Sequence, residues 1–345
     1  MRAVTVHAPG DLRVEEFPTP EPSPGQVLVR IVYGGICGSD LHYAKDARNG
    51  NYRVLEPLVL GHEVVGVVAD VGADTPAAPP VGTRVAIHPA TPSAPAGATG
   101  PTGLHLQRGG TYLGSASTQP HTQGGFVELL RVGVDRLRVL PDGLPLRRAV
   151  LAEPLAVALH GVSRLGDRVR GARVLVSGAG PIGALAVAAL RHAGAQHITA
   201  ADLQELPLRV ASAVGADATV NLSTGGLPEA EFDVVVEAAG VVPSLVAAIR
   251  AVRPGGAILQ LGILPAGPQP IPVSELVGKE VALFGTQRFD VELDAAVALL
   301  AAEPGLAAVV TDVYEIGDAA AAFARAADSA QSSKTVLAVS PDPDA

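Results

Sequence analysis

The sequence predicts an α/β protein of two domains, in which a doubly wound parallel sheet is inserted into a β-rich domain. Three observations support this prediction. A chain of 345 residues is long enough for two domains that each bury a core. Residues 1–150 contain short apolar or alternating runs between Pro/Gly-rich turns, which are typical of irregular β structure. From about residue 170, apolar strands alternate with helical segments, which is typical of a parallel sheet with right-handed crossovers.

The first domain is expected to consist of short strands joined by turns. The apolar or alternating runs are Gln26–Val32, Val64–Val71, Arg84–His88 and Phe126–Arg131. The turns between them are rich in Pro and Gly, as in Pro18–Gly25 and Asp74–Gly82. Residues 89–124 have little apolar periodicity, and a loop of this length in a compact domain is normally functional or a relic.

The second domain is expected to alternate strictly between strands and helices. The predicted strands are Arg173–Ser177, His197–Ala201, Phe232–Glu237 and Ala257–Leu261. The predicted helices are Ile182–Ala193, Leu206–Val214 and Ser244–Val252. After about residue 288 the pattern continues with a helix at Val291–Ala302, a strand near Val309–Val313, a helix at Asp318–Ala327 and a strand at Thr335–Val339.

Composition narrows the class of protein before any motif is considered. The net charge is −9, and because phosphate binding depends on clustered Lys and Arg, we expect no nucleic-acid and no membrane partner. No stretch reaches the roughly 20 apolar residues of a membrane span. The start of the chain, Met1–Val6, lacks the apolar core of a signal peptide, so we expect a cytoplasmic protein. The single cysteine, Cys37, excludes an intramolecular disulfide and a cysteine-rich zinc cluster.

A glycine-rich segment follows the first strand of the second domain. It consists of Gly178, Ala179, Gly180, Pro181, Ile182 and Gly183 and fits the pattern G-x-G-x-x-G. An apolar strand enters it and an apolar helix leaves it, as in the Rossmann fold. There Gly178 permits the tight turn, Gly180 lets the backbone approach a pyrophosphate, and Gly183 lets helix and strand pack closely. The phosphates would lie at the start of the helix near Pro181.

An acidic residue indicates which dinucleotide binds. Asp202 lies 19 residues after Gly183, at the end of the next strand, where a carboxylate hydrogen-bonds the adenosine ribose. Its charge would repel the additional phosphate of NADP, so the sequence predicts NAD. Arg209 would favour NADP if it turned toward the ribose, but it lies within a predicted helix.

Three further segments contain residues of the types that bind zinc. They are Gly34–Tyr43, which includes Cys37, Gly61–Gly66, which includes His62 and Glu63, and Glu153–His160. A catalytic zinc takes three Cys, His or carboxylate ligands and leaves a fourth position for water or substrate. Cys37 and His62 would provide two of the ligands, and Glu63 or Glu153 the third. Spacing alone leaves this set open, because the chain has nine histidines.

The amino-acid sequence of these segments resembles that of the medium-chain zinc alcohol dehydrogenases, and the resemblance extends along the whole chain. The matching strings are Gly34–Tyr43, Leu60–Val64 with Gly66, Gly114–Ala116, Pro120–His121, Gly124–Phe126, Glu153–Ala158, Gly278–Glu280 and Arg288–Phe289. They are most similar to the polyol branch, which includes sorbitol, threonine and L-idonate 5-dehydrogenases, and to the last of these above all. The resemblance implies a GroES-like catalytic domain at residues 1–152, an NAD-binding Rossmann domain at residues 153–287, and a return to the catalytic domain at residues 288–345.

The resemblance also implies roles for the candidate metal ligands. Cys37 and His62 match zinc ligands. We expect Glu153 to be the third ligand, directly or through water, with Glu63 able to exchange with it. Asp40 matches the acid that hydrogen-bonds the ligand imidazole and fixes its tautomer.

Further residues match positions that contact substrate or cofactor in the family. Ser39 and His42 match a proton relay from the alcohol through the cofactor ribose to solvent, and Ser39, Glu153 and Arg288 are expected to contact the substrate. Additional cofactor contacts are expected from Leu261, Ile263, Thr286 and Arg288. Zinc would act as a Lewis acid toward a secondary alcohol, and hydride would pass to the nicotinamide and leave a ketone.

One departure from the family concerns a second metal. The family usually carries a lobe in which four cysteines bind a structural zinc. The corresponding positions here are Ser93, Ala96, Thr99 and Gln107, and none is a zinc ligand. We therefore expect one catalytic zinc per chain and no structural zinc, with the lobe held by packing or by a subunit contact.

The expected substrate is a secondary alcohol of a polyol or sugar acid, with L-idonate first, because Arg288 offers a planar fork that can hold a carboxylate. Arg288 could equally pair with a protein acid or with the cofactor. Sorbitol, xylitol, L-threonine and glucose remain alternative substrates. A zinc-free quinone or enoyl reductase and a non-catalytic nicotinamide-binding protein are further alternatives; the retained zinc ligands argue against the first, and Ser39 with His42 against the second.

The resemblance finally implies a homotetramer built as a dimer of dimers. In the family the cofactor domains pair through edge strands, which correspond here to residues near Ile258–Ile263 and Val281–Gly285.

Overall fold

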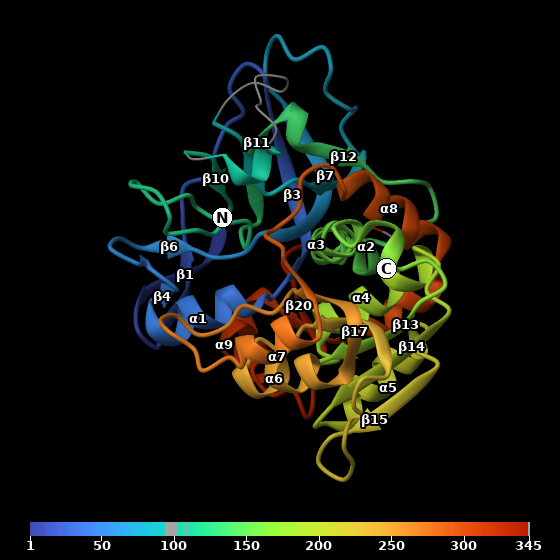
Figure 1. The fold of residues 1–345 in the computed structure, drawn as a ribbon. Helices are drawn as coiled ribbons and strands as arrows, with labels where there is room; N and C mark the ends of the chain where they lie inside the picture. The colour runs from blue at the N-terminus through green and yellow to red at the C-terminus, as the bar shows by residue number, and fades with distance from the viewer. Residues whose placement is uncertain (94–102, 108, 344–345) are drawn as a thin grey trace.

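The structure is a computed structural model, and it describes residues 1–93, 103–107 and 109–343. Figure 1 shows one body of β structure from the N-terminal half of the chain, in blue and teal, and a second from the middle of the chain, in green to orange. The C-terminal part, in red, returns to the first body.

The larger N-terminal sheet joins strands from both ends of the chain. Its strands are β3 (Gln26–Gly35), β7 (Glu63–Val71), β8 (Arg84–Ile87), β11 (Leu129–Gly133), β12 (Leu137–Val139), β19 (Val310–Glu315) and β20 (Lys334–Ala338). Strand β3 pairs with β7, β11 and β20. Because Gly35 at the end of β3 lies opposite both Glu63 of β7 and Val336 of β20, three distant segments of the chain meet at this point.

Smaller ladders surround this sheet. They are the three-stranded sheet of β1 (Arg2–Ala8), β2 (Asp11–Glu16) and β6 (Leu58–Val59), and the pairs β4 (Arg48–Asn49) with β5 (Tyr52–Arg53) and β9 (Ala90–Thr91) with β10 (Thr111–Tyr112). Helix α1 (Gly38–Asp46) follows β3 after a short turn. Cys37 occupies the N-cap position of this helix, where the chain changes from extended to helical.

The second sheet is parallel throughout its described pairings. Its order is β15 (Ala218–Asn221), β14 (His197–Asp202), β13 (Arg173–Ser177), β16 (Phe232–Glu237), β17 (Val252–Gln260) and β18 (Ala282–Gly285). The winding reverses between β13 and β16, and ligands of such sheets bind at this reversal, beyond the carboxyl ends of the strands. The glycine-rich segment lies there, directly after β13.

The remaining described helices cover or connect the two sheets. They are α2 (Leu146–Ala149), α3 (Ala152–Ser163), α4 (Pro181–His192), α5 (Glu205–Ala213), α6 (Val242–Ala251), α7 (Val273–Gly278), α8 (Leu293–Ala302) and α9 (Ala319–Ala326). Short 3-10 turns are η1 (Leu104–Leu106), η2 (Val134–Arg136), η3 (Gly166–Arg168), η4 (Pro304–Val309) and η5 (Ile316–Asp318). No helix of the described chain is long and apolar enough to cross a membrane.

Helix α3 is apolar on nearly every side and is therefore buried, as expected for a helix that lies inside a protein. Its neighbours include α4, α8 and β7, so it lies between the two bodies of β structure. A Cβ atom on Gly161 would lie 3.2 Å from Leu261 and 3.5 Å from Thr286, so only a small residue allows this approach. The first turn of α3 carries Glu153 into the interior.

The predicted α/β class and the alternation of the second half are confirmed. Strands β13 and β16 have the predicted bounds, and the predicted helices agree with α4, α5, α6, α8 and α9 within two residues. The elements without a predicted counterpart include the strands β1, β2 and β15, the short strands β4, β5, β6, β9, β10 and β12, and the helices α1, α2, α3 and α7. One expectation is wrong: the segment near Ile258–Ile263 is not an edge strand, because β17 lies between β16 and β18. Within the described residues β18 forms this edge of the sheet.

A half-buried contact between His160 and Glu292 connects α3 to the start of α8. His160 Nδ1 lies 2.8 Å from Glu292 Oε1, and Glu292 Oε2 accepts the N–H groups of Asp290 at 2.8 Å and Val291 at 3.0 Å. Burial alone would raise the pKa of Glu292, but these hydrogen bonds outweigh it and lower the pKa from 4.5 to about 2. The ionised carboxylate therefore stabilises the fold.

Glu292→Gln should lower the free energy of unfolding at neutral pH by about 1–2 kcal/mol, since it replaces bonds to a charged acceptor. A carboxyl whose pKa is lowered by folding stabilises the protein above its unfolded pKa, so the difference should shrink as the pH falls from 4.5 toward about 2. Urea denaturation over a pH series measures it. Asp294→Asn, at an exposed neighbouring acid, is the matched control. A difference between Glu292→Gln and wild type that does not change with pH would contradict this assignment.

Candidate active site

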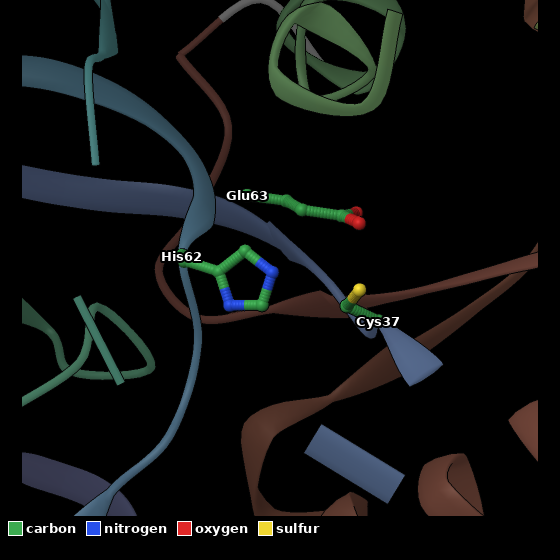
Figure 2. Close-up of side chains that lie close together, drawn as sticks. All are labelled: Cys37, His62 and Glu63. Atoms are coloured by element: carbon green, nitrogen blue, oxygen red, sulfur yellow. The ribbon is translucent and has the colours of Figure 1, made fainter. Parts of the chain in front are cut away.

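Three potential metal ligands meet where β3, β7 and β20 come together. The ligand atoms of Cys37, His62 and Glu63 all lie within 4.8 Å of one another. Figure 2 shows the thiol, the imidazole and the carboxylate directed toward a common region. No other group of three or more such residues lies this close in the part of the chain that the structure describes. Glu153, which was expected to be the third ligand, is not part of this group.

Asp40 holds the turn that carries Cys37 and lies beside the imidazole of His62. Its carboxylate is fully buried and accepts the N–H groups of Cys37 at 3.0 Å and Gly61 at 3.2 Å. His62 Nδ1 lies 3.8 Å from Asp40 Oδ1, which leaves Nε2 as the nitrogen available for a metal. Burial raises the pKa of Asp40.

Glu63 is paired with a lysine that the sequence analysis did not single out. Lys334 Nζ lies 2.8 Å from both carboxylate oxygens of Glu63 and 3.0 Å from the carbonyl oxygen of Ile36, and it is 2 % exposed. Burial alone would lower the pKa of Lys334, but the charge of Glu63 outweighs it and raises that pKa. Lys334 is therefore a cation at physiological pH.

Tyr112, on β10, contacts the same cluster through the imidazole ring of His62. Its hydroxyl donates a hydrogen bond to Glu153 Oε1, and its ring centre lies 5.6 Å from that of His62. Burial, together with the charge of Glu153, raises the pKa of Tyr112 well above its ordinary value, so the phenol remains the donor. The guanidinium of Arg288 lies over the same ring, 4.1 Å from its centre.

The donor set fits a zinc ion. Thiolate, imidazole and carboxylate are the three ligand types that zinc accepts in proteins. The side chains around His62 also carry an excess of negative charge. Burial alone would lower the pKa of His62, but Asp40, Cys37 and Glu153 outweigh this effect and raise that pKa well above its ordinary value. A bound cation would compensate these charges.

The glycine-rich segment has the geometry that the motif requires. Gly178 has φ +92°, and a Cβ atom there would lie 2.5 Å from the backbone nitrogen of Ala239. A Cβ atom on Gly183 would lie 1.9 Å from the carbonyl oxygen of Gly178, so α4 packs against the turn only with glycine. Gly180 faces open space, which leaves room for a ligand. Asp202 Oδ2 accepts the N–H of Ala179 at 2.8 Å, so this carboxylate also holds the loop.

The other predicted cofactor residues lie near the carboxyl ends of the parallel strands, except for Arg209, which lies in the middle of α5. Pro181 and Ile182 form the half-buried first turn of α4. Leu261 and Thr286 both approach Gly161, and Thr286 Oγ1 is buried without a hydrogen-bond partner in the described chain. Ile263 is 83 % exposed, as a residue that contacts a ligand would be without it. Arg209 is exposed on α5.

The two predicted relay residues lie on α1. Ser39 is half-buried and His42 is exposed. Because residues three apart share one face of a helix, the two side chains extend from the buried cluster toward solvent.

The lobe that replaces the family's structural zinc site is only partly described. Ser93 and Gln107 lie in described segments, whereas Ala96 and Thr99 lie outside the described residues.

Comparison with known proteins agrees with this architecture. Residues 23–142 match the family model of the alcohol dehydrogenase GroES-like domain, and residues 181–302 match that of the zinc-binding dehydrogenases. The chain therefore belongs to the medium-chain zinc-dependent alcohol dehydrogenases, which are oxidoreductases acting on CH–OH groups, and to their polyol branch.

Individual relatives narrow the position within the family. The chain is 33 % identical over 336 residues to sorbitol dehydrogenase of Macaca fascicularis, with 93 % of this chain and 91 % of that protein covered. It is 37 % identical over 282 residues to L-idonate 5-dehydrogenase (NAD(P)(+)) of Escherichia coli strain K12, with 79 % and 80 % covered. The crystal structure of L-idonate 5-dehydrogenase from Escherichia coli matches with a TM-score of 0.89 at 32 % identity, covering 98 % of this chain and 97 % of that one.

Lys334→Met should lower the free energy of unfolding by about 3 kcal/mol, because it leaves the charge of Glu63 buried and unpaired. The double variant Lys334→Met/Glu63→Gln should be less destabilised than the sum of the single variants, because both charges are then absent. Urea denaturation of zinc-free protein measures both effects, with Lys45→Met on the exposed part of α1 as control. Additive effects of the two substitutions would show that the ion pair does not stabilise this site.

Proposed function

We propose that the protein oxidises a secondary alcohol of a sugar acid or polyol to a ketone, using NAD and one catalytic zinc ion. The observation that carries this proposal is the buried cluster of Cys37, His62 and Glu63, which lies together with Asp40 and Lys334. Cys37, His62 and Glu63 would hold the zinc, with Glu153 as a nearby carboxylate able to take the place of Glu63. When bound, zinc supplies Lewis-acid chemistry that makes an alcohol more acidic.

The chain's own residues would orient the reactants and move the proton. Gly180 and the first turn of α4 would bind the pyrophosphate, and Asp202 the adenosine ribose. Ser39 would accept the proton of the alcohol, and His42 would pass it to solvent, since Ser39 is half-buried and His42 exposed. Thr286 and Leu261 would hold the nicotinamide end of the cofactor, which when bound would supply the acceptor for the hydride of the carbinol carbon.

The first substrate to test is L-idonate, followed by other aldonates and polyols. Two relatives are named for L-idonate and sorbitol, and Arg288 offers a guanidinium over the ring of Tyr112, whose hydroxyl bonds to Glu153. L-threonine, xylitol and glucose are the alternatives within the same chemistry.

We also propose a homotetramer built as a dimer of dimers. The support is that β18 forms a sheet edge within the described residues and that Leu283 on it is 46 % exposed. Analytical ultracentrifugation of the full chain measures its mass.

An assay of NADH absorbance at saturating NAD should show turnover with at least one aldonate or polyol from a panel that includes L-idonate, L-iditol, sorbitol, xylitol and L-threonine. The absence of NADH formation with every member, in protein that contains zinc and binds NADH, would favour a non-catalytic nicotinamide-binding protein.

Purified protein should contain one zinc ion per chain, and Cys37→Ala or His62→Ala should remove the metal and abolish turnover while the fold remains. The reason is that each substitution removes one ligand of a three-ligand set. Metal analysis, activity and circular dichroism measure these effects. His192→Ala, at an exposed histidine on α4, should keep both zinc and activity. Two tightly bound zinc ions per chain would contradict the expectation of a single site.

NAD should be preferred over NADP, although the Escherichia coli relative is named for both cofactors. Asp202→Ser should weaken NAD binding about tenfold, the equivalent of ~1.4 kcal/mol, because ribose and loop hydrogen bonds are both lost. The Asp202→Ser substitution should also reduce the preference for NAD over NADP, since the carboxylate that repels the additional phosphate of NADP is then absent. Kinetics with each cofactor measure this, with Glu205→Gln as control. Equal use of both cofactors by the wild type would rule out the role given to Asp202.

A further inference from the structure

Arg288 is linked to the cluster of Cys37, His62 and Glu63 through Tyr112, whose ring contacts both Arg288 and His62. Among the described residues no carboxylate forms an ion pair or hydrogen bond with the guanidinium of Arg288, which contacts the face of Tyr112. The backbone at Arg288 has φ +50°, a conformation that residues other than glycine rarely adopt. The next residue, Phe289, is 2 % exposed and packs with its ring 4.8 Å from that of His88, so the segment is anchored directly after Arg288.

Tyr112 is itself held firmly. It is 7 % exposed, its backbone pairs with Ala90 in the β9–β10 ladder, and the N–H of Leu113 donates to the carbonyl oxygen of Pro89 at 3.0 Å. One side chain therefore makes two contacts of different chemistry. The hydroxyl fixes the carboxylate of Glu153, and the ring face fixes the guanidinium of Arg288.

We propose that Tyr112 is a positioning residue that determines substrate choice. By stacking against Arg288 it holds the planar guanidinium ready to bind a carboxylate in bidentate fashion, and the protein consequently prefers hydroxylated carboxylic acids to uncharged polyols. This inference rests on the proposed function and specifies its substrate class. The hydroxyl of Tyr112, through Glu153, affects acids and polyols alike, because it does not contact the group in which they differ.

The two contacts can be separated by substitution. Tyr112→Phe keeps the ring and removes the hydroxyl, whereas Tyr112→Leu removes both. Arg288→Ala removes the guanidinium, and Arg288→Lys keeps the positive charge but loses the planar fork that stacks and binds a carboxylate. The test compares L-idonate with L-iditol, which differ in having a carboxylate or a hydroxymethyl group at one end.

The measured quantity is the ratio of kcat/KM for L-idonate to that for L-iditol. Tyr112→Phe should lower kcat with both substrates and keep the ratio within about twofold of the wild type. Tyr112→Leu, Arg288→Ala and Arg288→Lys should each lower the ratio about tenfold, mainly through the KM of the acid. An equal loss on both substrates in Tyr112→Leu, or the same fall of the ratio in Tyr112→Phe, would overturn the proposal.

A second readout does not depend on turnover. Binding of L-idonate and L-iditol to the protein–NADH complex is measured by NADH fluorescence for the wild type, Tyr112→Phe and Arg288→Lys. Arg288→Lys takes the place of Tyr112→Leu if that variant does not fold. The proposal is supported if the acid binds more tightly than the polyol and if this difference is kept in Tyr112→Phe and lost in Arg288→Lys. This result would support it even if no substrate turned over, in which case only the proposed function would fail. A wild type that binds both compounds equally, or neither, would overturn it.

Discussion

Buried negative charge is the constraint on which the rest of the structure depends. Asp40 and Glu63 are fully buried, Glu153 is 6 % exposed, and the sole cysteine lies beside them. Isolated charges inside a protein cost several kcal/mol each unless they are paired. Lys334 compensates Glu63, and a metal ion would compensate much of the rest. The fold must therefore place a lysine beside Glu63 and leave space for a cation among the other acidic side chains.

The topology of the N-terminal sheet meets this requirement. Strand β7 begins with Glu63, β20 begins with Lys334, and both pair with the same end of β3. Glycine is needed at that end, because a Cβ atom on Gly35 would lie 2.2 Å from Glu63 Oε2. The C-terminal return of the chain thus does more than close a sheet: it supplies the cation that makes a carboxylate next to His62 tolerable.

The residues that could be predicted from the sequence are those whose signals are local. The glycine-rich segment follows from its G-x-G-x-x-G pattern, and the strands β13 and β16 follow from apolar runs that alternate with helices. Cys37, His62 and Asp40 follow from short strings that match a family. Tyr112 and Lys334 could not be predicted in this way. Their partners lie 41 and 271 residues away, and neither a lone tyrosine nor a lysine at the start of a strand has a distinctive local pattern. The same limit applies to the choice between Glu63 and Glu153, which depends on how β7 and α3 pack rather than on spacing.

X-ray absorption spectroscopy at the zinc edge of the purified protein tests the central claim most directly, because it reports the ligands of the metal. We expect one sulfur atom at about 2.3 Å and nitrogen or oxygen atoms at about 2.0–2.1 Å from the zinc, as for Cys37, His62 and a carboxylate. In Cys37→Ala protein any remaining zinc should show no sulfur neighbour. Zinc bound without a sulfur ligand in the wild type would contradict the assignment of this cluster as the metal site.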